Sequence, residues 1–134
     1  MLNPKLTFAA STILPSVFTD DRFRHTGRNR LFGEIDGTRV GVVLATRSQR
    51  FDNFALNKGD FDRLIAGLRE GKIDQAYVVQ ARSNGFGAMV YAAYIKAEQL
   101  AEMLNGHPPM TSQLGPFWVL PPGFKMAGGI DEPF

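Results

Sequence analysis

Cysteine is absent from this 134-residue sequence, and histidine occurs only twice. The chain therefore has no disulfide, no thiolate zinc site and no thiol nucleophile. His25 and His107 lie far apart in the sequence, and neither has a second ligand at the spacing of a metal site. We therefore expect no cofactor.

Long apolar runs are also missing. No stretch approaches the roughly 20 residues that a membrane-spanning helix needs, and the first residues lack the basic and apolar order of a signal peptide. We expect a soluble cytoplasmic protein without a membrane partner. The serines have no Gly-x-Ser-x-Gly context, and there is no Gly-x-x-x-x-Gly-Lys phosphate loop. The sequence therefore assigns no catalytic residue.

The composition is that of a globular domain, with 44% hydrophobic and 21% charged residues. We expect an N-terminal arm over residues 1–28, one globular α/β domain over 29–122 and a loose C-terminal tail over 123–134. The arm has no sustained period, yet it is too apolar for a solvated tail. We expect it to dock on a partner chain through Leu2, Leu6, Phe8, Ile13, Leu14, Val17 and Phe18.

The strongest local pattern is a β-hairpin centred on Asp36-Gly37. This dipeptide separates two runs of β-forming residues and suits a two-residue type I′ turn. The hairpin would place Glu34 opposite Arg39 as a cross-strand pair of opposite charge. Its second strand is apolar on both faces, Val43 and Ala45 forming part of the second face, which predicts an interior strand.

The remaining pattern predicts a helix over 58–70 capped by Asn57, strands over 76–81 and 88–95, a helix over 97–104 and a strand over 117–120. The order β-β-α-β-β-α-β favours a mixed α+β fold, with helices packed on a mixed sheet. The first helix permits a parallel crossover, whereas the six-residue loop between the third and fourth strands predicts an antiparallel pair.

Positive charge is concentrated in one segment. The whole chain carries +2, but residues 22–50 hold seven arginines against two carboxylates and carry +5. Guanidinium groups match phosphate geometry, so this segment predicts phosphate contacts with DNA or RNA. The alternative is a solvated basic edge that pairs with acidic residues. The candidate nucleic-acid-binding residues are Arg22, Arg24, Arg28, Arg30, Arg47 and Arg50.

A family resemblance covers about 50 residues of this region. Gly33-Glu-Ile-Asp36, Val42-Val-Leu-Ala-Thr-Arg47, the following helix and the Tyr77-Val-Val strand resemble the core of the PD-(D/E)xK nuclease superfamily. In that family an Asp at one strand end and a Glu-x-Lys on the next strand bind a divalent metal and activate water. The resemblance implies Asp36 as a metal ligand. Val43 and Ala45 stand where the family has Glu and Lys, so it implies a catalytically incomplete core.

Two hypotheses follow, from different functional classes. The first is a nucleic-acid-associated domain whose arginines contact phosphates. The second is a structural or interaction protein that forms homo-oligomers through its N-terminal arm or an edge strand. A small-molecule enzyme is a further alternative, with a cleft lined by Tyr91, Tyr94, Gln80 and Arg82.

Overall fold

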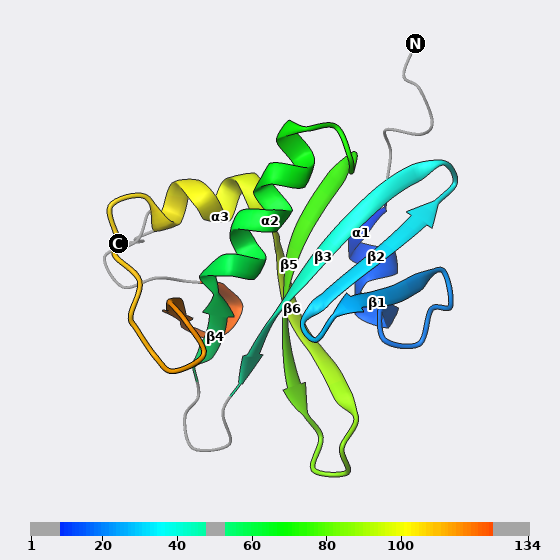
Figure 1. The fold of residues 1–134 in the computed structure, drawn as a ribbon. Coiled ribbons are helices and arrows are strands. Elements are labelled where there is room, and N and C mark those ends of the chain that lie inside the picture. Colours follow the sequence, from blue (N-terminus) through cyan, green and yellow to red (C-terminus); the bar gives the residue numbers. More distant parts are fainter. Residues whose placement is uncertain (1–8, 48–52, 125–134) are drawn as a thin grey trace, which may run out of the picture.

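The computed structural model describes residues 9–47 and 53–124 and contains a seven-stranded sheet with helices on both faces (Figure 1). The elements in chain order are α1 (Ala10–Ile13), η2 (Leu14–Ser16), β1 (Phe23–Gly27), β2 (Arg30–Ile35), β3 (Thr38–Arg47), β4 (Phe54–Asn57), α2 (Lys58–Arg69), β5 (Gln75–Ser83), β6 (Met89–Lys96), α3 (Ala97–Leu104), β7 (Phe117–Leu120) and η3 (Pro122–Phe124). The predicted mixed sheet in a single α+β domain is confirmed.

Strand β3 is the centre of the sheet. It pairs with β2 in the antiparallel sense, with β5 in the parallel sense, and with β4 at its carboxyl end. Strand β5 in turn pairs with β6 in the antiparallel sense, and β4 with β7. The parallel crossover that the sequence permits and the predicted antiparallel pair are both present. Strands β1 and β4 were not anticipated.

The hairpin register agrees with the prediction, since Glu34 lies opposite Arg39. Asp36 and Gly37 adopt φ angles of 51° and 83°, as a type I′ turn requires. The side chains differ from the prediction. Arg39 binds Asp74 through two hydrogen bonds, Nη2 to Oδ1 at 3.0 Å and Nε to Oδ2 at 3.2 Å. A two-pronged carboxylate contact is stronger than a single cross-strand attraction, so Asp74 is the hydrogen-bonded partner of Arg39.

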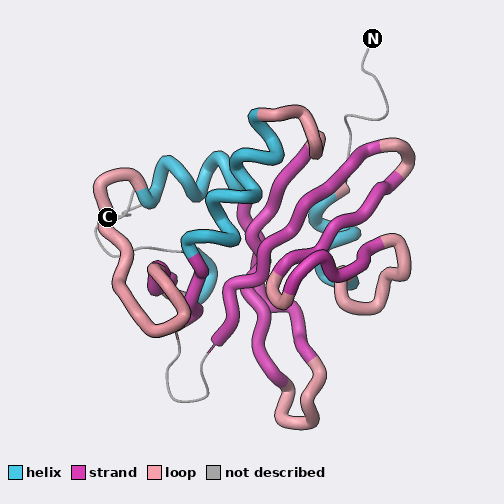
Figure 2. Tube along the Cα trace, viewed as in Figure 1, coloured by secondary structure: helices cyan, strands magenta, loops and turns pink. Residues whose placement is uncertain are grey.

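Helix α2 begins as its sequence predicts. The Asn57 side chain accepts a hydrogen bond from the Asp60 backbone N–H at 2.9 Å, and this satisfies one of the free donors of the first turn. Phe61 and Leu64 point into the core. Helices α2 and α3 cover one face of the sheet, while α1 and η2 cover the other (Figures 1 and 2).

Of the predicted segments, the N-terminal arm agrees least with the structure. Leu14 and Val17 are 0% and 2% exposed and pack on this chain's own sheet, together with Phe23 of β1. The described part of the expected arm is therefore integral to the domain, because its apolar side chains close the sheet face that α2 and α3 leave open. The expected tail likewise begins later, since Phe124 of η3 is buried. Residues 1–8 and 125–134 lie outside the described chain.

Tyr77 lies on the same sheet face and gives the fold a dependence on alkaline pH. It is 2% exposed, and its hydroxyl donates to Gln75 Oε1. Burial raises the pKa of Tyr77 to about 12 from the ordinary 10, so the folded state disfavours the phenolate.

We expect the free energy of unfolding to fall by about 2 to 3 kcal/mol between pH 10 and 12, because the unfolded chain ionises first over this range. Below about pH 10 the stabilising contribution of the neutral Tyr77 side chain is fully present. Urea titrations of the wild type and Tyr77→Phe across this range measure it, and the variant should give the flatter curve. If the free energy of unfolding fell equally with pH in the two proteins, the raised pKa of Tyr77 would be contradicted.

Candidate functional site

Three arginines of the basic segment have carboxylate partners. Arg22 Nη2 lies 2.7 Å from Asp20 Oδ2. The side-chain and backbone hydrogen bonds from Arg22 lower the pKa of Asp20 to about 2. Arg30 contacts Asp60 at 3.5 Å, and Arg39 binds Asp74. The seven arginines therefore do not form one unneutralised surface, as the polynucleotide hypothesis required of them.

The other predicted arginines divide between two places. Arg24 of β1 lies over the Phe32 ring, its guanidinium carbon 5.3 Å from the ring centroid. Arg28 is exposed in the turn between β1 and β2. Arg47, at the end of β3, lies in a different pocket, described below. Arg50 is outside the described residues.

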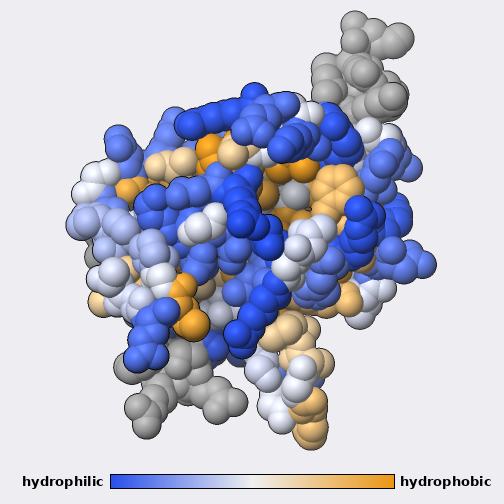
Figure 3. Space-filling view, viewed as in Figure 1, coloured by the Kyte–Doolittle hydropathy of each residue, from blue (hydrophilic) through white to orange (hydrophobic). Residues whose placement is uncertain are grey.

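A groove lies between α2 and strands β2 and β3, and we call it the hairpin groove. Its volume is about 220 Å³, and Figure 3 shows a hollow in this region with hydrophobic atoms between hydrophilic rims. Its charged lining residues are Arg30, Arg63 and Lys72 against Asp60. Its other lining residues are Thr26, Leu31, Phe32, Gly41, Val42, Val43, Leu64, Gly67 and Ile73.

Glycine 41 keeps the floor of the hairpin groove flat. A Cβ at this position would lie 2.7 Å from Ile73 Cδ1 and 3.0 Å from Leu64 Cδ1, closer than ordinary contact. The two aliphatic side chains can therefore approach the sheet backbone and make an apolar floor. Any larger residue at this position would push them into the groove.

The cations Arg63 and Lys72 were missed because they lie outside the arginine-rich segment. The pattern of α2 could have indicated Arg63. Positions 60, 63 and 67 follow the i, i+3, i+7 spacing of one helix face, beside the buried stripe of Phe61 and Leu64. Arg63 and Lys72 are exposed, and Arg63 has no ion pair with a described residue.

Asp36, the predicted metal ligand, lies in the turn at the far end of the hairpin from Arg30. The pKa of Arg22 is raised chiefly by its hydrogen bonds to Asp20 and, to a lesser degree, by the charge of Asp36. Val43 and Ala45, the positions that the predicted resemblance compares with the family's Glu and Lys, are 1% and 0% exposed in the core. Within residues 9–47 and 53–124, no three His, Asp or Glu side chains are grouped to hold a metal ion.

A second hollow lies beside the carboxyl ends of the parallel strands β3 and β5. It measures about 400 Å³, and we call it the Arg82 pocket. Its lining residues are Arg47, Phe54, Gln80, Arg82, Tyr91, Ala92, Pro122 and Gly123. The cleft that the sequence suggested thus brings together Gln80, Arg82 and Tyr91. Tyr94 does not belong to it and packs edge-on against Tyr77, with ring centroids 5.8 Å apart.

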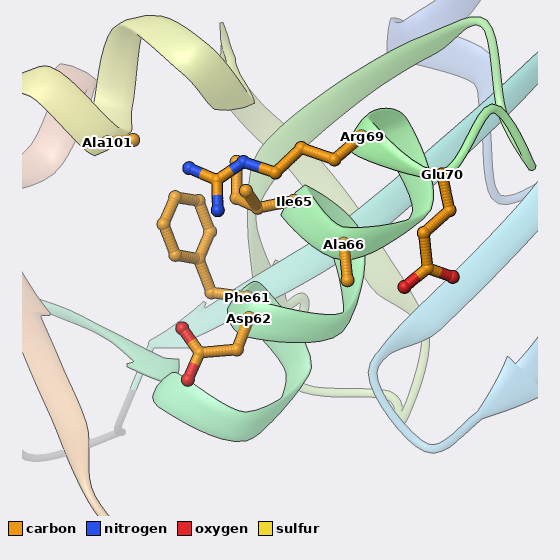
Figure 4. A pocket seen from close by; sticks show the side chains of 7 residues that line it. All are labelled: Phe61, Asp62, Ile65, Ala66, Arg69, Glu70 and Ala101. Atoms are coloured by element: carbon orange, nitrogen blue, oxygen red, sulfur yellow. The ribbon is translucent and has the colours of Figure 1, made fainter.

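A third hollow of about 450 Å³ separates α2 from α3 (Figure 4). In this view the Arg69 side chain extends across it above Phe61 and toward Ala101, whereas Asp62 and Glu70 point away. Its lining has one cation against two carboxylates. This charge balance makes it the least suited of the three hollows to binding an anion. Its Arg69 serves below as a control position for variants of the hairpin groove.

In the described part of the chain, every helix is too short or too polar to cross a bilayer. Comparison of the chain with protein-family models, with curated proteins and with solved structures found no match. The geometry of the side chains is therefore the basis for a functional proposal.

Proposed function

We propose that this chain is a non-catalytic nucleic-acid-binding domain that holds the phosphate backbone of DNA or RNA along the hairpin groove. The observation that carries the proposal is the lining of this groove, where three cations surround an apolar floor and only one carboxylate opposes them. Phosphate contacts of this kind give affinity without sequence preference.

Two of these cations have ion pairs that a phosphate can replace. Arg30 contacts Asp60 at 3.5 Å, and Lys72 contacts Glu70 at 3.1 Å on the open surface. The Lys72–Glu70 pair is solvent-exposed and contributes only about 0 to 1 kcal/mol, so exchanging its carboxylate for a phosphate costs little. The partly buried Arg30–Asp60 pair is held by a long contact of 3.5 Å. Arg63 needs no such exchange. The groove can therefore offer three cations to a bound strand.

The Arg24–Phe32 pair adds a flat surface beside the groove. Arg24 is exposed and its guanidinium covers one side of the Phe32 ring. Planar guanidinium groups stack on nucleobases as they stack on aromatic rings. A single strand with unpaired bases could use both the cations and this surface, so we expect single strands to bind more tightly than duplexes of the same length.

The test is fluorescence anisotropy with labelled mixed-sequence oligonucleotides at about 50 to 200 mM salt. We expect Arg63→Gln with Lys72→Gln to weaken binding at least about tenfold at the lower salt and to reduce the salt slope by about one for each lost contact. The matched control is Arg69→Gln with Lys58→Gln. It likewise removes one arginine and one lysine charge, but at positions of α2 that do not line the hairpin groove. We expect it to bind like the wild type.

Loss of affinity in both double variants would mean that net charge, and not the groove, governs binding. No binding by the wild type at the lower salt would overturn the proposal. The oligomerisation alternative has less support, because Leu14 and Val17 of the expected docking arm are buried within this chain.

A further inference from the structure

The β5–β6 hairpin ends in an exposed aromatic ring. Phe86 lies at its tip and is 93% exposed, so it contributes nothing to the core. The hairpin extends from the body in Figure 1. Figure 3 shows hydrophobic atoms at the end of this hairpin, on the same face of the molecule as the hollow of the hairpin groove. The ring is therefore accessible to a ligand that lies in that groove.

Hydrogen bonds within the turn fix the backbone that carries this ring. The Asn84 N–H donates to the Ala88 carbonyl at 3.0 Å, and the Phe86 N–H donates to Asn84 Oδ1 at 2.8 Å. Gly85 and Gly87, on either side of the ring, adopt φ angles of 91° and 86°. A Cβ at either glycine would meet no other atom within 4 Å. The tip is therefore narrow, and a flat ligand can approach the ring closely.

The charge of the hairpin suits a polyanion. Residues 75–96 contain Arg82 and Lys96 but no Asp or Glu, and Arg82 is exposed near the tip. A phosphate backbone therefore meets no carboxylate along this hairpin. A stable protein interface buries about 800 Å² on each partner, more than one ring between two glycines can supply. One ring does match the face of one nucleobase, and aromatic side chains stack on bases of any sequence.

The register of the sheet relates the tip to the hairpin groove. Val43, which lines the groove, lies opposite Val78 of β5. From Val78 to Phe86 the chain reaches at most about 26 Å, at about 3.3 Å for each residue. A stacked strand, at about 3.4 Å for each nucleotide, covers this distance with about eight nucleotides. One strand longer than this can therefore contact both places.

We propose that Phe86 stacks on an unpaired base of a single strand whose phosphates lie in the hairpin groove. This inference rests on the proposed function and specifies its substrate, a single strand longer than about eight nucleotides. The groove cations supply the salt-dependent part of the affinity, and the ring supplies a part that does not depend on salt.

The test is fluorescence anisotropy with labelled single strands of about 16 and about five nucleotides. We expect Phe86→Leu to weaken binding of the longer strand at least about fivefold, because leucine stays apolar but loses the aromatic face. The salt slope should not change, since no charge is lost, and Phe86→Trp should bind at least as tightly as the wild type. The shorter strand cannot reach from the groove to the tip, so it should bind equally to the wild type and Phe86→Leu.

The matched control is Leu114→Ala, which alters another exposed apolar side chain outside the hairpin and should bind like the wild type. Thermal unfolding verifies that each variant is folded.

The outcomes separate this inference from the groove proposal. Equal affinity of the wild type and Phe86→Leu for the longer strand would overturn the inference and leave an apolar pocket of a protein as the partner of Phe86. The groove proposal would stand if Arg63→Gln with Lys72→Gln still weakened binding. Loss of affinity in Phe86→Leu alone would support stacking and overturn the groove proposal. No binding of either strand by the wild type would overturn both.

Discussion

Replacing Leu14 with alanine is expected to lower the free energy of unfolding by about 3 kcal/mol, within the range of about 2 to 5 for buried leucines. Leu14 is 0% exposed and lies in the core on the sheet face opposite α2 and α3, with Val42 and Val79. Its removal leaves a cavity that short α1 and η2 can close only in part.

Urea denaturation measures this change, and Ile13→Ala is the matched control. Ile13 is adjacent in sequence but only partly buried, so we expect it to lose less than half as much. The comparison also separates two roles of the N-terminal residues. Docking on a partner chain would make the Leu14→Ala effect depend on protein concentration, whereas packing on this chain's own sheet makes it independent of concentration.

Replacing Gln80 with leucine is expected to lower the free energy of unfolding by about 1 to 3 kcal/mol, because it removes two part-buried hydrogen bonds of the buried Gln80 side chain. The substitution removes the bonds to the Pro121 carbonyl and the Gly123 N–H, which join β5 to the segment after β7. The Pro121 carbonyl still accepts from the Phe124 N–H at 3.1 Å, whereas the Gly123 N–H loses its acceptor.

The measurement is again urea denaturation, with hydrogen exchange at Gly123 as a local readout. We expect faster exchange there in Gln80→Leu, since the N–H loses its acceptor. Gln113→Leu makes the same chemical change at an exposed loop position and should stay within about 0.5 kcal/mol of the wild type. If Gln80→Leu also left the free energy of unfolding within about 0.5 kcal/mol of the wild type, a stabilising role of the Gln80 hydrogen bonds to this segment would be refuted.

Local chemistry explains why much of the fold could be predicted. Asp36 and Gly37 fix a turn type, and a two-residue turn fixes the register of its hairpin. The cap at Asn57 and the apolar spacing after it fix the start and buried face of α2. These features depend on residues within a few positions of one another.

The candidate sites could be predicted only in part. Arg24 and Arg30 were named, but Arg63 and Lys72 reach the hairpin groove from α2 and the loop after it. Arg47 was named for polynucleotide binding, and the parallel pairing of β3 and β5 sets it beside Arg82 instead. Both outcomes follow from contacts between distant segments.

By itself, the sequence determined the hairpin, both longer helices, the mixed sheet and the total positive charge, because turn chemistry and periodicity act over short stretches of chain. Only the tertiary structure decided which arginines are neutralised, as Arg22 is by Asp20 and Arg30 by Asp60. It also decided that Leu14 completes the core. The physical reason is that ion pairing and burial depend on distances across the fold, and strand register and helix placement set those distances.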